Sequence, residues 1–168
     1  MPTAIVTGAS RGLGFELTRA LLREGRRVVI DARGVRELEA AERTLAELGD
    51  VVAVRGNVTD PDHRAELLAA AGPALDVLVN NASVLGPSPQ PPLASYPVEV
   101  LEYVYRVNVV APLALVQLAL PHLAPGAVHR RHRRRCRPSA RGEPHHRAAS
   151  GFGGVGDLGA GTVGSVDR

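Results

Sequence analysis

The feature that most constrains this chain is a glycine-rich turn set between an apolar run and an amphipathic helical pattern. The run Thr3–Thr7 is short, apolar and rich in β-branched residues, as buried strands are. The turn TGASRGLG follows at once, and residues 14–23 then repeat apolar side chains at helical spacing. A strand, a glycine turn and a helix in this order predict an α/β fold in which backbone approaches a ligand closely.

The alternation of strand and helix continues through the first 128 residues. Further strand-like runs are Arg27–Asp31, Val51–Val54, Leu75–Val79 and the start of a fifth at Gly126–Val128. Helical patterns cover Val35–Leu48, Asp60–Ala71 and Val98–Leu123, the last with Pro112 as a candidate kink. This order predicts right-handed crossovers and a doubly wound, Rossmann-like parallel sheet. Because the pattern stops after Val128, we expect the sheet to be incomplete on its C-terminal side.

The charge of the chain divides at the same point. Residues 1–128 carry 11 Arg and 14 acidic residues, whereas residues 129–168 carry 9 Arg and 3 acidic residues. We therefore expect a nucleotide-binding domain over residues 1–128 and a disordered Arg- and Gly-rich tail over residues 129–168. A nucleic-acid-binding arm is the alternative for the tail, but it is disfavoured because Phe152 is the tail's one aromatic residue. The irregular spacing of the tail's His and Cys residues predicts no metal site.

Composition excludes several other classes of protein. Apolar residues make up 45% of the chain, enough to bury a core, and a single Cys excludes a disulfide framework. No apolar run reaches the roughly 18 residues of a membrane span. The N-terminus lacks the basic segment and cleavage site of a signal peptide. We therefore expect a cytoplasmic protein that does not enter a membrane.

The glycine-rich turn predicts a site for the phosphates of a nucleotide. Glycines spaced in this way let the backbone turn tightly and approach a pyrophosphate. The helix that follows begins with unpaired backbone N–H groups and a positive dipole, both of which favour an anion. The residues that we expect to bind the cofactor here are Gly8, Ser10, Arg11, Gly12, Leu13 and Gly14.

Three motifs together resemble those of the short-chain dehydrogenase/reductase family. They are the TGxxxGxG spacing, the run Asn80-Asn81-Ala82-Ser83 after the fourth strand, and Asn108 in the following helix. Ser83 replaces the last glycine of the family's motif. The resemblance covers residues 1–128, roughly the first half of such a domain. It implies an NAD(P)-dependent oxidoreductase that acts on a small alcohol or carbonyl compound and forms a homo-oligomer.

The resemblance also implies roles for particular residues. Asn81 and Ala82 would line the adenosine side of the cofactor. Asn57 and Val58 stand where relatives place an Asp-Val pair against the adenine, and the Asn amide still offers a donor and an acceptor. Asn108 matches the catalytic asparagine, which holds a water in the proton relay.

Two interpretations of the second strand compete over the cofactor. Spacing alone makes Asp31, 17 residues past Gly14, an acid that binds the ribose hydroxyls of NAD. In the family the discriminating acid falls one place later, where this chain has Ala32, and Arg33 would then face the 2′-phosphate of NADP. Arg11 adds a second guanidinium, and two guanidiniums bind a phosphate through charge-assisted hydrogen bonds. We therefore favour NADP over NAD.

The same resemblance exposes a conflict over catalysis. The family protonates its substrate with a Tyr-x-x-x-Lys motif downstream of the fifth strand, yet this chain has no Lys and no Tyr after Tyr105. We therefore expect impaired catalysis, with an inactive nucleotide-binding remnant as the alternative function. Under one choice of codons, reading from His129 to Arg137 one base later gives a strand-like run, Ile-Val-Asp-Ile-Val-Asp-Ala-Ala-Val. A divergent, truncated or frameshifted C-terminal part is our hypothesis for this conflict.

Overall fold

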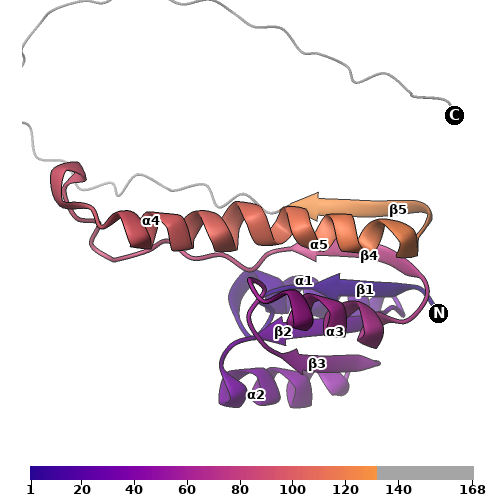
Figure 1. Cartoon of the computed structure of the whole chain (residues 1–168). Coiled ribbons are helices and arrows are strands. Elements are labelled where there is room, and N and C mark those ends of the chain that lie inside the picture. The colour runs from indigo at the N-terminus through magenta and orange to yellow at the C-terminus, as the bar shows by residue number, and fades with distance from the viewer. Residues whose placement is uncertain (132–168) are drawn as a thin grey trace, which may run out of the picture. The chain divides into compact units, whose positions relative to one another are not determined.

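A parallel sheet of five strands forms the centre of the structure, a computed structural model that describes residues 1–131. The strands are β1 (Thr3–Val6), β2 (Arg27–Ala32), β3 (Val51–Arg55), β4 (Leu75–Asn80) and β5 (Leu123–Arg131). They lie in the order β3-β2-β1-β4-β5, and every neighbouring pair is parallel (Figure 1). The predicted doubly wound, Rossmann-like sheet is thereby confirmed.

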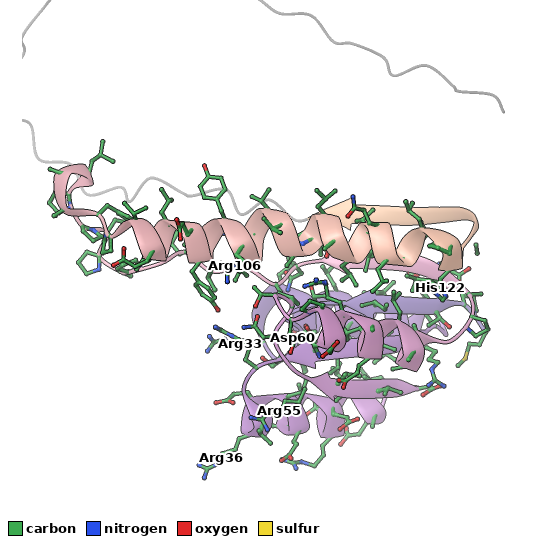
Figure 2. The ribbon with its side chains drawn as sticks, viewed as in Figure 1. Arg33, Arg36, Arg55, Asp60, Arg106 and His122 are labelled. Atoms are coloured by element: carbon green, nitrogen blue, oxygen red, sulfur yellow. The ribbon has the colours of Figure 1, made fainter. Side chains whose placement is uncertain are left out.

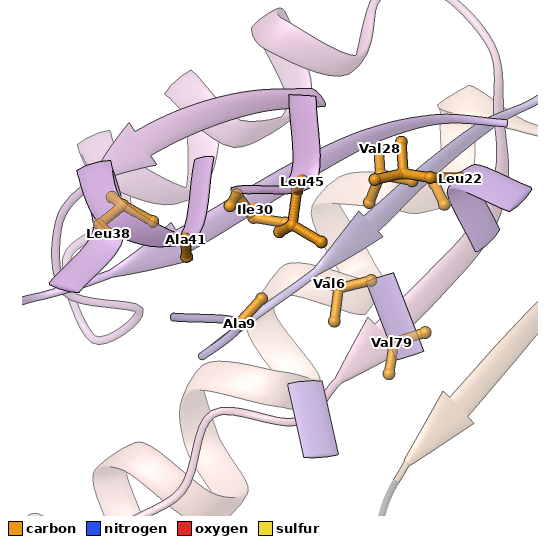
Figure 3. Close-up of a cluster of buried hydrophobic side chains, with 10 residues drawn as sticks. Val6, Ala9, Leu22, Val28, Ile30, Leu38, Ala41, Leu45 and Val79 are labelled. Carbon is orange, nitrogen blue, oxygen red and sulfur yellow. The ribbon is translucent and has the colours of Figure 1, made fainter. Parts of the chain in front are cut away.

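Helices cover both faces of the sheet. They are α1 (Gly12–Arg23), α2 (Val35–Ala46), α3 (Pro61–Ala71), α4 (Val98–Tyr105) and α5 (Ala111–Ala119). On one face, Leu22 of α1 and Leu38 of α2 join Ile30 of β2 in a buried cluster (Figure 3). A second buried cluster contains Leu67 of α3 and Leu115 of α5. Because both faces are covered, the strands read as continuous apolar runs rather than alternating ones.

The long helical run after the proline-rich loop changes its winding partway. After α4 the backbone widens into a π-helical turn, Arg106–Val110, before α5 begins, and a 3-10 turn, Leu120–His122, ends the run. Pro112 lies at the start of α5. In an unbroken α-helix its ring would collide with the carbonyl of residue 108, and the π-helical turn directly before it relieves that collision.

The helical run Val98–His122 is long and apolar enough to cross a membrane, by length and composition alone, and an 18-residue window within it has a mean hydropathy of 1.4. This corrects the expectation that no segment reaches that size. The finding is weak evidence for a span, because the core helix of a soluble protein passes the same test. Here Val107, Ala111 and Leu115 are all buried, four residues apart, which is the pattern of a helix packed along one face.

Strand β5 carries the sheet farther than the sequence predicts. It pairs His129 with Leu78 and Arg131 with Asn80. The expectation that the sheet stops at Val128 is therefore wrong. A parallel ladder is made by backbone N–H and C=O groups, which every residue except proline supplies, so a basic run can extend a strand at the edge of a sheet.

Several predictions for the C-terminal tail lie outside the described residues. They are its disorder, its lack of a metal site, its alternative role as a nucleic-acid-binding arm, and the frameshift hypothesis. The predicted boundary between residues 128 and 129 falls inside β5. For residues 132–168 the assignment as a tail stays a prediction.

Candidate functional site

A cavity of about 550 Å³ lies at the carboxyl ends of the first four strands. Its walls come from the segments that follow β1, β2, β3 and β4, and from the helical run that begins with α4. In the strand order, β1 stands between β2 and β4, so the chain leaves β1 toward one side of the sheet and later returns to the other. Such a switch point in an open parallel sheet is where ligands bind.

The glycine loop at this switch point is tied to the end of β4. The side-chain amide nitrogen of Asn81 donates to the carbonyl oxygens of Thr7 and Gly8, at 2.9 and 3.0 Å. The hydroxyl oxygen of Thr7 accepts the backbone N–H groups of Asn81 and Ala82, both at 3.0 Å. A Cβ on Gly14 would collide with the Asn81 amide and lie 2.6 Å from the Gly8 carbonyl oxygen. Gly14 is therefore needed where α1, the loop and Asn81 meet.

The amino end of α1 contributes directly to the cavity. Ser10, Arg11 and Leu13 line it there. Arg11 is the N-cap residue, in an extended conformation, and its side chain makes no capping hydrogen bond. The first backbone N–H groups of a helix have no intrahelical acceptor, and an anion is a suitable partner for them. This end of the cavity fits a diphosphate.

Asp31, at the end of β2, anchors the glycine loop. The residue is 1% exposed, although the cavity reaches it. One carboxylate oxygen accepts the backbone N–H of Gly8 at 2.6 Å, and the other lies 2.9 Å from Nε2 of His63 in α3. An ionised carboxylate only accepts hydrogen bonds, so Nε2 of His63 is the donor. Each oxygen of Asp31 thus already accepts one hydrogen bond within the protein, and its role as a ribose ligand stays a prediction.

His63 is the buried side-chain partner of Asp31. It is 4% exposed, its ring lies directly against Gly56, and its Nδ1 is buried without a hydrogen-bond partner among the described residues. We expect His63→Ala to lower the free energy of unfolding by about 1.5–3 kcal/mol, because it leaves one oxygen of a buried carboxylate unpaired. Urea unfolding measures this loss. Glu66→Gln is the matched control, since Glu66 is 3.9 Å from Nδ1 and 65% exposed, and little change is expected there.

Two arginines bring positive charge to the cavity from different segments. Arg11 belongs to the glycine loop, and Arg33 follows β2. A guanidinium nitrogen of Arg33 donates to the hydroxyl of Tyr103 in α4 at 2.9 Å. Glu37 also lines the cavity and is the opposing charge on this side. Figure 2 shows Arg33 near the long helix, whereas Arg36 lies farther off at α2.

An apolar patch forms another part of the cavity wall. Val58 and Val107 are buried in one small cluster, with Ala82 packed against it. All three line the cavity. Asn57 lies beside them, and its carboxamide oxygen accepts the backbone N–H of Thr59 at 3.1 Å. The patch suits the flat, largely apolar face of an adenine ring.

Asn108 does not line the cavity in this structure. Its side-chain oxygen accepts the backbone N–H of Val84 at 2.9 Å, and its nitrogen donates to the Val84 carbonyl oxygen at 2.7 Å. The residue lies in the π-helical turn and so fixes the loop after β4 to the long helix. Its role in a proton relay stays a prediction.

The structure thus brings most of the predicted cofactor residues to one cavity. Gly12 and Gly14 shape the loop without lining it, and Asn108 supports the wall from behind. Tyr103 and Val107 also line the cavity but were not among the predicted cofactor residues, although their spacing of four residues on a helix places them on one face. The predicted residues that do line it are Gly8, Ser10, Arg11, Leu13, Arg33, Asn57, Val58, Asn81 and Ala82.

Comparisons with known proteins agree with this geometry. The family described as short chain dehydrogenase matches residues 2–131. The 1-deoxy-11-beta-hydroxypentalenate dehydrogenase of Streptomyces avermitilis is 39% identical over 125 residues, which are 72% of this chain and 46% of that protein. The solved NADP complex of Pseudomonas aeruginosa RhlG has 34% identity and a TM-score of 0.64, covering 72% of this chain and 47% of that one.

A second solved structure is a variant of actinorhodin polyketide ketoreductase with NADPH. It has 30% identity and a TM-score of 0.66, and the match covers 71% of this chain and 46% of that one. The chain spans about half the length of the curated relatives that it matches.

Proposed function

This chain belongs to the short-chain dehydrogenase family, and from that premise we propose that its cavity binds NADP(H) for hydride exchange with an alcohol or carbonyl compound. The observation that carries the proposal is the meeting of the glycine loop, Arg11 and Arg33 at one cavity. Ala32 stands where the resemblance would place a ribose-binding acid. The solved relatives named with NADP and NADPH support the same cofactor.

Different residues of the cavity would bind different parts of the cofactor. The backbone N–H groups at the start of α1 would hold the diphosphate, which the dipole of that helix favours. Arg33 and Arg11 would hold the 2′-phosphate, and Val58, Ala82 and Val107 would face the adenine. When bound, the nicotinamide supplies or accepts the hydride. What this chain's own residues do is bind and orient it.

A second candidate function is nucleotide binding without catalysis. It is favoured by the sequence itself, which has no Lys and no Tyr after Tyr105 to protonate the substrate. In this case the small-molecule substrate has no role, and the cofactor is the ligand. The predicted cytoplasmic location fits either function, because both need a nucleotide from the cell interior.

Cofactor preference is tested by removing the Arg33 guanidinium. We expect Arg33→Ala to weaken binding of NADPH by about 1–3 kcal/mol, through the loss of a charge-assisted hydrogen bond, and to leave NADH binding almost unchanged. Titration of each cofactor, followed by nicotinamide fluorescence, gives both dissociation constants. Arg36→Ala is the matched control, since Arg36 is an exposed arginine on α2 that does not line the cavity. Equal losses for both cofactors would contradict the assignment of Arg33.

We also propose that the chain self-associates, as the family resemblance implies. Large apolar side chains are exposed along the helical run, at spacings of three, four and seven residues; they are Val98, Leu101, Tyr105, Val109, Leu113 and Leu120. Exposed apolar stripes of this kind mark contact surfaces. We expect Val109→Glu with Leu113→Glu to shift the protein toward monomer in sedimentation, while Leu48→Glu, an exposed leucine beyond the end of α2, leaves the assembly unchanged. An unaltered assembly in the double variant would contradict this surface.

A further inference from the structure

We propose that Tyr103 is a positioning residue for cofactor specificity, because its hydroxyl holds the Arg33 guanidinium at the place where the 2′-phosphate of NADP binds. This inference rests on the proposed function. The observation that carries it is the 2.9 Å hydrogen bond from Arg33 to the Tyr103 hydroxyl. Both residues line the same cavity, and no motif or resemblance in the sequence pointed to Tyr103.

The Tyr103 ring is itself held in place. It packs against the buried cluster that contains Val58 and Val107, and it lies on α4 just before the π-helical turn. A tyrosine has only two side-chain torsions, so a packed ring fixes the position of its hydroxyl. Packing of the partly buried ring therefore limits where the hydroxyl oxygen can lie.

Arg33 needs such an acceptor more than a buried arginine would. It is exposed and carries a long side chain that samples many rotamers unless something holds it. A guanidinium has five N–H donors, so one hydrogen bond to Tyr103 leaves others for a phosphate. A guanidinium that is already oriented loses less conformational freedom when the ligand binds, and this strengthens binding.

The hydrogen bond also joins two walls of the site. Arg33 follows β2, whereas Tyr103 comes from the helix that follows β4, 70 residues later in the chain. Glu37 lies on the same side of the cavity, and its carboxylate opposes a dianion. The hydrogen bond holds the Arg33 guanidinium toward α4. There its positive charge offsets the repulsion between Glu37 and the 2′-phosphate. The pairing therefore favours a ligand that carries the 2′-phosphate and is neutral toward one that lacks it.

The test uses the full chain and two adenosine fragments, 2′,5′-ADP and 5′-ADP, whose binding is measured by calorimetry. We expect Tyr103→Phe, which keeps the ring and removes the hydroxyl, to weaken 2′,5′-ADP by about 3- to 10-fold, the size of one ordinary hydrogen bond, because the hydroxyl acts on the ligand only through Arg33. Binding of 5′-ADP should change by less than about 2-fold, since no hydrogen bond to it is lost. Tyr105→Phe is the matched control, because Tyr105 lies on the same helix, is 58% exposed and does not line the cavity.

A double variant separates positioning from a general structural effect. In the Arg33→Ala background, Tyr103→Phe should weaken 2′,5′-ADP by less than about 2-fold, because the hydroxyl acts through Arg33. If the unmodified chain prefers 2′,5′-ADP but Tyr103→Phe leaves that preference intact, the inference about Tyr103 is overturned and the proposed cofactor stands. Equal weakening of both fragments would also overturn it, since that is the result of general damage to the site. If the unmodified chain shows no preference for 2′,5′-ADP, the proposed NADP specificity fails, and the role of Tyr103 fails with it.

Discussion

The purified 168-residue chain is expected to bind NADPH and yet not oxidise it when ketones or aldehydes are supplied. Cofactor binding orients a hydride, but the alkoxide that forms needs a proton donor, and general acid catalysis is usually worth about 10²–10⁴-fold in rate. Asn108 does not replace that donor, because an amide is not an acid near neutral pH and its side chain is bonded to Val84. Tyr103 is bonded to Arg33, and the chain contains no lysine to activate either it or another tyrosine.

The measurement is the loss of NADPH absorbance with a panel of carbonyl compounds, after binding has been verified by fluorescence titration. Turnover of about 1 s⁻¹ or above, the lower end of common enzyme rates, would mean that the catalytic residues have been assigned wrongly. The matched comparison is a chain in which the reading frame after Val128 is restored. Turnover that appears only in that chain would support the frameshift hypothesis and assign the chemistry to residues that the present chain does not contain.

Replacing Gly14 with valine is expected to abolish cofactor binding and to lower the free energy of unfolding by at least about 3 kcal/mol. A side chain there meets the Asn81 amide, the Gly8 carbonyl oxygen and Ala9. Overpacking of a tight site costs about 1–3 kcal/mol, and each displaced buried hydrogen bond adds about 1–3 kcal/mol. Asn81 makes two such bonds to the loop, so the loop loses the shape that a diphosphate requires.

The matched control for this effect is Gly12→Asn. Gly12 has a φ of 61° but nothing within 4 Å of an added Cβ, and asparagine tolerates this left-handed conformation better than other side chains do. We expect a loss below about 1 kcal/mol in urea unfolding for this variant. Similar losses for Gly12→Asn and Gly14→Val would mean that loop flexibility, rather than the close approach of Asn81, explains the glycines.

The order of strands and helices could be predicted because it depends on local patterns. Continuous apolar runs such as Arg27–Asp31 match a strand that is buried on both faces, and β2 occupies nearly those residues. The glycine-rich turn could also be predicted from the sequence, since a tight turn and a close backbone approach both require residues without a side chain. Where a prediction counted side chains alone, it was less accurate. The end of β5 was misplaced because its pairing with β4 depends on backbone groups that all residues share.

Contacts between distant residues explain what the sequence did not reveal about the site. The spacing of Asp31 from Gly14 does not reveal its partner His63, which lies 32 residues farther along, in α3. A sequence pattern does not show which polar groups come into contact after the connections between parallel strands have folded. A buried carboxylate needs hydrogen-bond donors. The donors to Asp31 are the backbone N–H of Gly8 and the side chain of His63, so this carboxylate joins the glycine loop to α3.

The sequence by itself determined the parallel α/β architecture, the glycine-rich turn and the family, because each of these follows from residue types at short, fixed spacings. Only the tertiary structure decided that Asp31 is an anchor and that Arg33 is held by Tyr103. It also decided that β5 extends to Arg131. The physical reason is that a hydrogen bond forms between groups within about 3 Å of each other in space. Residues 70 positions apart reach that distance only after the sheet and its crossovers have formed.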